Sequence, residues 1–384
     1  MSLRLQSFLF LCQCLALDQD PETIDRLRRE IKRGSVDWGS IVQIANEQLV
    51  SPALWTSLMN KALHEDLPDE LKYYLSGLHN LNLQRNGLIK QQAEEIITSL
   101  NKVGIEPILL KGAALLLINA FCDSGTRILA DLDIMVLTTD VEESWRTLSS
   151  LGYKAHDPDV PMDEWSHHLP TMIRDGEPAA IELHTQLFHR YDGIMVLTAR
   201  DCFNEAATIR KKSLCFKVLS LPHFIIHNIV HIEVHHLHFY SGDISLRDLL
   251  DFAVISDSQP HSIDWKSIED KMEEHGIRHI YRSYLHMAVT LLDAPVPCAF
   301  GLTVGTRIHL RRRLLICGSG RLKTLSSRLT NLVSLCQIVS LNLTVERLKI
   351  RFGCSEGIVD LNKTRLKYLW FLFRKYVLKT RKYS

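Results

Sequence analysis

The first 100 residues place apolar side chains at helical spacing between short polar starts. Asp20-Pro21-Glu22 offers an N-cap, a proline at the first helical position and an early acid, which predicts a helix start. Val36-Asp37-Trp38 predicts a second start, and Pro68-Asp69-Glu70 begins a long helix that continues to about Leu100. The apolar stripe of this long helix comprises Leu71, Leu75, Leu78, Leu81, Leu88 and Ile96. We therefore expect a helical region over residues 1–100.

The pattern changes at Gly104, where a strand–helix–strand arrangement begins. Residues 105–110 form a short apolar run typical of a buried strand, and residues 113–121 have the composition of an apolar helix. After a polar turn, residues 130–136 alternate between polar and apolar side chains. Because successive side chains of a strand point to opposite faces, this alternation predicts one polar and one apolar face.

The remaining periodicity predicts a short meander of strands followed by helices, with Asp175-Gly176 as a hairpin turn. Strands are expected around residue 153, over 168–173 and over 180–187, after a helix over 140–148. Later helices are expected over residues 223–237, 245–255, 265–275 and 280–292. The predicted regions are an N-terminal helical region (1–100), an α/β core (101–215), a helical region packing on that core (216–298) and a basic helical C-terminal region (299–384).

Composition places the chain among ordinary globular proteins. Of its 384 residues, 46% are hydrophobic and 23% are charged, and the formal net charge is +1. This balance excludes disorder as the dominant state, since disordered chains combine low apolar content with high net charge. The small net charge hides an asymmetry, because residues 300–384 hold 18 Lys and Arg against three acids, or +15, and the rest carries −14. An acidic body therefore joins a basic end.

The cysteines and the apolar segments indicate a cytoplasmic protein. The nine cysteines form no CxxC pair and suit neither a disulfide framework nor a cysteine-rich zinc site. The apolar run over residues 8–12 lies between Gln6 and Gln13 and lacks a small-residue cleavage motif, which predicts a core helix and not a signal peptide. The longest uncharged stretch, residues 329–345, is too short and too polar to predict a transmembrane helix.

Asp131 and Asp133 are the residues whose pattern points most directly to chemistry. At positions i and i+2 of a strand, their carboxylates project from the same face. Such a pair either repels or shares cations, and two oxygen-bound Mg²⁺ ions can stabilise the attacking and leaving oxygens of a phosphoryl transfer. The alternative is an exposed strand end whose acids are solvated.

Several neighbouring residues favour the metal-dependent interpretation. Lys111-Gly112 lies at a predicted strand-to-helix junction, where a glycine lets phosphate approach the backbone and a helix start favours anions. Arg127 precedes Asp131 by four residues, where it can meet a phosphate. Glu182 alternates with apolar neighbours on a later strand, from which it can reach the same face as a third carboxylate. His184 shares the face of Glu182 and either orients that carboxylate, contacts substrate or has a structural role.

Together these segments resemble the uncharacterised nucleotidyltransferase family of minimal-nucleotidyltransferase type, in the DNA polymerase beta superfamily. The segments that carry the resemblance are residues 109–114, Arg127 with residues 130–133, residues 181–184, the leader over 36–45, and the later His227 and His231 with Arg247-Asp248-Leu249-Leu250-Asp251. The likeness covers residues 5–290. It implies an α+β fold in which a minimal nucleotidyltransferase core, a small mixed sheet with helices, is flanked by N- and C-terminal helical regions.

The resemblance also implies a mechanism. It makes Asp131, Asp133 and Glu182 the catalytic carboxylates and the ligands of two Mg²⁺ ions, and Lys111, Gly112, Arg127 and His184 the nucleotide-binding residues. An acceptor hydroxyl would attack the α-phosphorus of an NTP, with ATP expected, and pyrophosphate would leave. The acceptor is open between a small hydroxyl compound, a protein side chain and a nucleic-acid end. The alternative from another class is a non-catalytic nucleotide-binding or scaffold protein that retains the fold.

Five histidines fall on one predicted helix: His227, His231, His235, His236 and His238. The first three recur at i, i+4 and i+8 and share a face, a spacing that can bind a transition metal. Neither an HExxH motif nor a two-histidine-one-carboxylate motif accompanies them. We therefore favour buried histidines that pack the second helical region against the core.

The basic end combines Arg311-Arg312-Arg313 with a group of aromatic residues, Tyr368, Trp370, Phe371 and Phe373. Basic and aromatic side chains together suit an anionic membrane surface or a nucleic acid. A solvated helical face that pairs with the chain's own acidic body is the simplest interpretation. Of the two external partners, the sequence favours the inner membrane surface, since it holds no nucleic-acid-binding motif.

Overall fold

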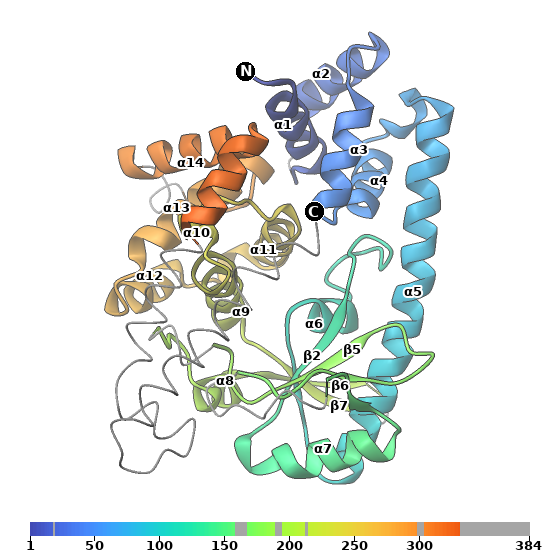
Figure 1. Cartoon of the computed structure of the whole chain (residues 1–384), viewed down its shortest axis with the longest axis vertical. Helices are drawn as coiled ribbons and strands as arrows, with labels where there is room; N and C mark the ends of the chain where they lie inside the picture. Colours follow the sequence, from blue (N-terminus) through green and yellow to red (C-terminus); the bar gives the residue numbers. More distant parts are fainter. Residues whose placement is uncertain (18–19, 158–166, 189–193, 212–213, 298–302, 331–384) are drawn as a thin grey trace, which may run out of the picture.

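One long helix connects the two halves of the molecule (Figure 1). The computed structural model describes residues 1–17, 20–157, 167–188, 194–211, 214–297 and 303–330. Helices fill one half, a mixed sheet lies in the other, and α5, Asp69–Lys102, runs along both. The structure therefore has the predicted α+β class, with a sheet flanked by N- and C-terminal helices.

The N-terminal region folds as the helical pattern predicts. Its helices are α1 Leu3–Leu15, α2 Pro21–Lys32, α3 Trp38–Glu47 and α4 Ser51–Asn60, followed by the 3-10 turn His64–Asp66. The Asp20 carboxylate accepts a hydrogen bond of 2.9 Å from the Thr23 amide, and Asp37 accepts one of 3.1 Å from the Ser40 amide. These caps satisfy amides that a bare helix start leaves unpaired, so both predicted starts are confirmed.

The apolar stripe predicted for α5 is wrong in its middle. Leu81 and Leu88 are 65% and 54% exposed, whereas Asn82 and Asn86 are buried. Both asparagine amides donate hydrogen bonds to backbone carbonyls of the polar loop 124–127. A loop packed against a helix needs donors for its carbonyl groups, and this requirement overrides the apolar periodicity there.

Within the described residues, seven strands form one mixed sheet in the order β3-β4-β5-β2-β1-β7-β6. They are β1 Ile108–Leu109, β2 Asp131–Met135, β3 Lys154–Ala155, β4 Met172–Ile173, β5 Ala180–His184, β6 Ala207–Lys211 and β7 Leu214–Val218. The centre of the sheet is β2, which runs antiparallel to β1 and parallel to β5. The hairpin of β6 and β7 has no counterpart among the predicted elements, because the largely exposed β6 lacks a clear apolar alternation.

The described residues outside the sheet form mainly helices, as predicted, but one helix is interrupted. The helices are α6 Lys111–Leu117, α7 Val141–Ser150, α8 Ala199–Glu205, α9 Leu221–Ile229, α10 His238–Ser241, α11 Leu246–Ser258, α12 Trp265–Glu274, α13 Arg278–Leu292 and α14 Val304–Cys317, with 3-10 turns at Thr138–Asp140 and Pro260–Ser262. The pattern predicts one helix over 223–237, whereas α9 passes into a π-helical turn, Val230–His235, and Leu237 is left-handed with φ 60°. The wider turn holds buried Glu233 2.7 Å from Arg313 of α14, a distant contact that local periodicity cannot predict.

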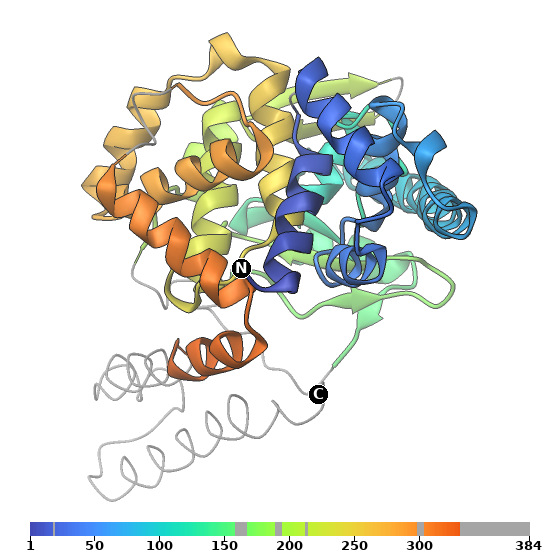
Figure 2. The same cartoon turned by 90° about the horizontal axis from the view of Figure 1, so that it is seen from above.

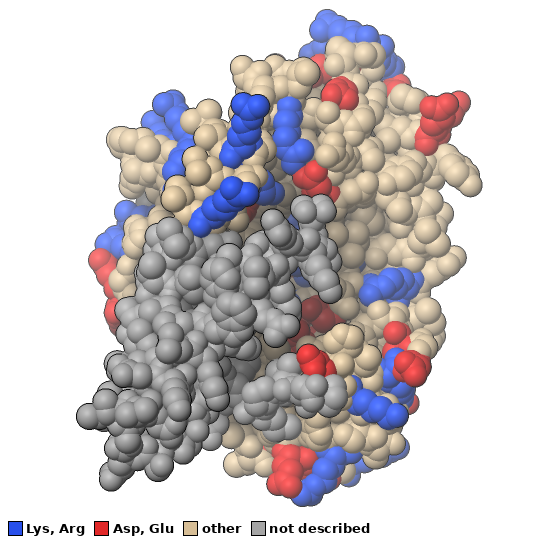
Figure 3. All heavy atoms as spheres, viewed as in Figure 1, with Lys and Arg blue, Asp and Glu red and all other residues tan. Residues whose placement is uncertain are grey.

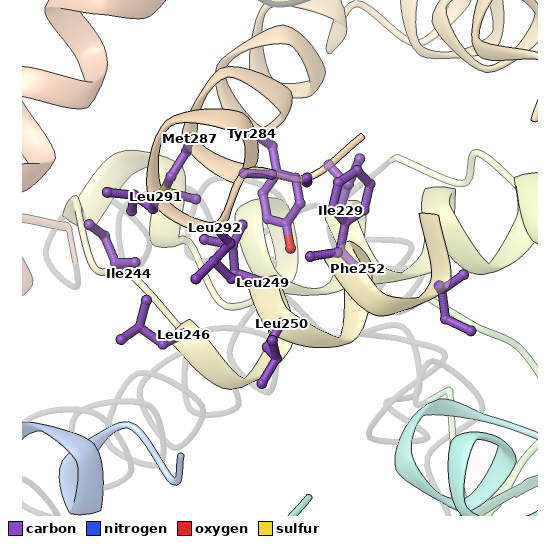
Figure 4. Close-up of a cluster of buried hydrophobic side chains, with 14 of the residues drawn as sticks. Ile229, Ile244, Leu246, Leu249, Leu250, Phe252, Tyr284, Met287, Leu291 and Leu292 are labelled. Atoms are coloured by element: carbon purple, nitrogen blue, oxygen red, sulfur yellow. The ribbon is translucent and has the colours of Figure 1, made fainter. Parts of the chain in front are cut away.

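Two hydrophobic cores hold these elements together. The larger core joins α1–α4 to α9, α11, α12 and α13, and buries Phe8, Leu54, Phe252, Tyr284 and Leu285 completely or nearly so. Figure 2 shows these two groups of helices side by side, and Figure 4 shows the part of this core around α11 and α13. The smaller core lies between α5, α6 and the sheet. Burying one apolar side chain completely stabilises a fold by about 1.5–3 kcal/mol. Because the larger core contains many such side chains from both groups of helices, it holds the N-terminal and later helices together as one layer beside the sheet.

The basic C-terminal region is described only in part. Its aromatic residues, Tyr368, Trp370, Phe371 and Phe373, lie outside the described residues. Among the helices that the structure describes, none has the length and apolar character needed to cross a membrane. Arg313, one of three consecutive arginines, is buried against Glu233 and belongs to the interior. The cysteines within the described ranges are free thiols, as the sequence predicts.

Candidate active site

Parallel pairing of β2 and β5 brings the predicted carboxylates together. In this register Asp133 lies directly opposite Glu182. Because side chains alternate along each strand, Asp131 and Asp133 share one face of β2, and Glu182 and His184 lie on the same side of β5. The sequence places these four residues on one face, and the observed register agrees with that placement.

Asp133 is the centre of this charged face and is only 1% exposed. Its Oδ1 atom accepts a hydrogen bond of 2.7 Å from the Lys111 ammonium and lies 2.9 Å from His184 Nε2. The same His184 nitrogen lies 3.7 Å from Glu182 Oε2. Within the described ranges, Asp133, Glu182 and His184 are the one group whose ligand atoms are close enough together to share a metal ion.

These contacts set the charges of the face. Burial raises the pKa of the Asp133 carboxyl, but the Lys111 ammonium and the His184 hydrogen bond outweigh it and hold that pKa well below its usual value. Burial also raises the pKa of Glu182, and the hydrogen bond from His184 leaves it below the usual value. Burial lowers the pKa of His184, whereas its bonds to the two carboxylates raise it on balance. Both carboxylates are therefore ionised at neutral pH.

Asp131 differs from its neighbours on the same face. It is half-buried, and no described residue gives its carboxylate a hydrogen bond or an ion pair. Burial raises the pKa of Asp131, and the negative charges of Asp133 and Glu182 raise it further. Three carboxylates facing one ammonium carry more negative charge than Lys111 neutralises, which makes this face attractive to a cation.

Lys111 reaches the carboxylates from the start of α6. The Leu110 amide donates a hydrogen bond of 3.0 Å to the Asp133 carbonyl, which ties the strand-to-helix turn to β2. Lys111 has φ 45°, a left-handed conformation that is unfavourable for a residue with a side chain. Strained residues of this kind persist where the surrounding structure holds them, and here the turn aims the ammonium at Asp133.

Gly112 and Arg127 belong to a second buried cluster of charges. The Arg127 guanidinium donates three hydrogen bonds of 2.8–2.9 Å to the carboxylate of Asp251 in α11. It packs on Gly112, where an added Cβ atom would lie 2.7 Å from Arg127 Cζ. The glycine thus makes room for the guanidinium. The structure does not bring Arg127 into contact with the carboxylates of β2, and the phosphate-binding role of both residues stays a prediction.

Sequence reasoning missed Asp251 as an ion-pair partner, and it missed two histidines beside the charged face. The ring centroid of His184 lies 5.0 Å from that of His167 and 5.4 Å from that of His168. A signal for His168 was present, because the predicted turn at Asp175-Gly176 folds its strand back against β5. In the structure His168 and His184 form an isolated antiparallel bridge.

The histidines of α9 and its π-helical turn lie close to this face but form no metal-binding group within the described ranges. The ring centroids of His227 and His231 are 5.6 Å apart, and those of His231 and His236 are 4.5 Å apart. Burial lowers the pKa of His227 and of His231, and the positive charge of Lys111 lowers both further. The prediction of buried histidines holds for His227 alone, since His231, His235 and His238 are half-buried and His236 is exposed.

A comparison with known protein families agrees with this geometry. A family model described as uncharacterised nucleotidyltransferase matches residues 34–293, which is more than half of the chain. The matched segment includes both charged clusters, from Lys111 to Asp251. No curated protein matches the chain. The fold, the carboxylate face and the matched segment together establish that the chain belongs to the uncharacterised nucleotidyltransferase family.

Proposed function

We propose that this protein is a cytoplasmic, Mg²⁺-dependent nucleotidyltransferase that moves a nucleoside monophosphate from an NTP, with ATP expected, to an acceptor hydroxyl. The observation that carries the proposal is the shared face of Asp131, Asp133 and Glu182, where three carboxylates meet one lysine ammonium. Carboxylate-bound Mg²⁺ ions are a common way for a protein to hold a nucleoside triphosphate.

The residues present fit two Mg²⁺ ions. Mg²⁺ prefers carboxylate oxygens, and Asp131 offers a carboxylate that no described residue engages. Asp131 and Asp133 would hold the ions from β2, and Glu182 would complete the set from β5. When bound, the ions would withdraw charge from the phosphate oxygens and from the departing pyrophosphate.

The other side chains position the nucleotide and the carboxylates. Lys111 would contact the β- and γ-phosphates, since its flexible ammonium already lies at the carboxylate face. His184 keeps Asp133 and Glu182 oriented through Nε2. Arg127 contributes through the reach of its charge, because its NH groups are largely held by Asp251.

In the proposed nucleotidyl transfer, one bond to phosphorus forms as another breaks, and a carboxylate takes up the released proton. The acceptor oxygen forms a bond to the α-phosphorus while the bond from that phosphorus to the β-phosphate oxygen breaks. Pyrophosphate carries the electron pair away, and the hydroxyl proton passes to the Glu182 carboxylate and then to water. His184 Nε2, which lies 3.7 Å from Glu182 Oε2, helps to hold that carboxylate in place.

Calorimetric titration with Mg·ATP tests the proposal most directly. We expect wild-type protein to bind and Asp131→Asn to lose binding by about tenfold or more, because one metal ligand is removed. The matched control is Glu142→Gln, an exposed acid on α7. Intact Mg·ATP binding in Asp131→Asn and in the Asp131→Ala/Asp133→Ala double variant would contradict the two-metal proposal.

Incubation with each α-labelled NTP and a cell extract identifies the acceptor. We expect label to appear on one class of molecule in the presence of Mg²⁺ and to disappear in Asp131→Asn. Mg·ATP binding without any labelled product across the four NTPs would instead support a non-catalytic nucleotide-binding protein.

A further inference from the structure

The outer face of α14 carries exposed aliphatic side chains. Val304, Ile308 and Leu315 are 74%, 62% and 62% exposed. With Arg311 they recur at i, i+4, i+7 and i+11, and so lie in one stripe along the helix. In the helical residues 320–330 that follow, three more leucines are exposed at i, i+3 and i+7: Leu322, Leu325 and Leu329.

The opposite face of α14 is packed, so this stripe is not a core face that the fold has left unpaired. Leu310 and Ile316 are buried. Arg313 is 1% exposed and forms its ion pair with Glu233 of the π-helical turn. Arg312 donates hydrogen bonds to the backbone carbonyls of Phe239 and Tyr240 in α10. The helix is therefore fixed in orientation, and its apolar stripe is held toward solvent.

The charges around the stripe have one sign. Residues 303–330 contain seven Lys or Arg and no Asp or Glu. No ion pair with the described residues engages five of them, Arg307, Arg311, Arg312, Arg321 and Arg328, whereas Lys323 lies 3.7 Å from Asp243. Figure 3 shows Lys and Arg side chains gathered over the region of α14.

We propose that the outer face of α14 and of residues 320–330, the aliphatic-basic face, docks on an anionic phospholipid surface. Aliphatic side chains at this spacing enter the boundary between headgroups and acyl chains, and unpaired arginines contact lipid phosphates. Charge alone would also suit a nucleic acid. The exposed apolar side chains of this face are aliphatic, however, whereas single-stranded nucleic acids are bound by stacking on aromatic rings. The proposal does not depend on the proposed function.

Vesicle cosedimentation of the full chain tests this assignment. The probes are phosphatidylcholine vesicles with and without phosphatidylglycerol. We expect binding to the anionic vesicles only, weakening as salt is added. The variant Ile308→Ser/Leu315→Ser removes the apolar contribution and Arg307→Gln/Arg311→Gln removes the charge contribution, and each should weaken binding by about tenfold. The matched control is Leu81→Ser/Leu88→Ser, which changes two exposed leucines of α5.

Several outcomes would overturn the proposal. They are an absence of vesicle binding, equal binding to neutral vesicles, and unchanged binding of both α14 variants with thermal melts like wild type. RNA binding that the α14 variants abolish, without vesicle binding, would assign the face to nucleic acid. A concentration-dependent dimer that Ile308→Ser/Leu315→Ser abolishes, again without vesicle binding, would assign it to a second copy of the chain.

Discussion

The two buried charge clusters use the same kinds of side chain and differ in balance. In the Arg127–Asp251 cluster, the guanidinium meets the carboxylate through three hydrogen bonds, so the charges cancel. In the carboxylate face of β2 and β5, three carboxylates face Lys111 and His184, and the Asp131 carboxylate is bonded to none of the described residues. A buried ion pair whose charges cancel needs no further partner, whereas an excess of carboxylates can bind a cationic ligand.

The clusters are also adjacent, because Lys111 belongs to one and Gly112 to the other. The packing of Arg127 on Gly112 fixes the start of α6, and the start of α6 aims Lys111 at Asp133. The Arg127–Asp251 cluster thus supports the carboxylate face. We therefore predict that changes in the Arg127–Asp251 cluster affect stability most, and that changes in the carboxylate face affect ligand binding.

The largest effect is expected for Arg127→Ala. It leaves the Asp251 carboxylate buried without its partner, and losing one member of a buried ion pair typically destabilises a protein by about 3–5 kcal/mol. Urea unfolding measures the change. The matched control is Arg146→Ala, whose partners on α7 are exposed, and about 1 kcal/mol or less is expected there. Equal losses for the two variants would remove the distinction between a balanced interior pair and a surface pair.

A smaller loss is expected for Gly112→Ala. The added methyl group meets the Arg127 guanidinium, and overpacking of this kind costs about 1–3 kcal/mol. Gly77→Ala in α5 is the control, since its Cβ meets nothing within 4 Å and should stabilise that helix by about 0.5–1 kcal/mol. Opposite signs in the two unfolding curves support the comparison. A stabilising effect at Gly112 would contradict the close approach of Arg127.

A comparable effect per pH unit is expected from His227, which is buried, and from His231, which is half-buried. Burial lowers the pKa of His227 and His231 in the folded state, so the unfolded state binds protons first. Their stabilising contribution is complete above a pH of about 6.5 and is lost as pH falls, by up to about 1.4 kcal/mol per unit for each histidine. Unfolding free energies measured between pH 5.5 and 7 check this. His227→Gln should flatten the dependence, and an unchanged slope would show that this ring is not kept neutral.

The smallest effect on stability is expected for Asp131→Asn. Because the charges of Asp133 and Glu182 disfavour the ionised Asp131, neutralising it should leave the unfolding free energy within about 0.5 kcal/mol of wild type or slightly raise it. The same variant should lose Mg·ATP binding. A large destabilisation with intact nucleotide binding would reverse the roles that the comparison gives to the two clusters.

Features set by a few neighbouring residues could be predicted from the sequence. The caps at Asp20 and Asp37 depend on residues three positions away, and the common face of Asp131 and Asp133 depends only on strand alternation. Glu182 required one further step, the assumption that a later strand lies beside β2. The alternation of Glu182 with apolar neighbours suggested that step, and the register of β2 and β5 agrees with it.

Features set by distant residues could not be predicted. Asp251 is 124 residues from Arg127, and no periodicity identifies it as the partner. The polar face of α5 exists because Asn82 and Asn86 bond to a loop that follows some 40 residues later. The π-helical turn accompanies the contact of Glu233 with Arg313, 80 residues further on. In each case the tertiary partner decides what the local pattern leaves open.

The separation of Arg127 from Asp251 also sets an order of events during synthesis. At about 5–20 residues per second, the ribosome needs about 6–25 s to add the 124 residues between them. Until α11 is made and docks, the Arg127 guanidinium lacks its carboxylate and the start of α6 lacks its support. The strands of the sheet are therefore made before the Arg127–Asp251 pair can form, and on the proposed function nucleotide binding would arise only after α11 has docked.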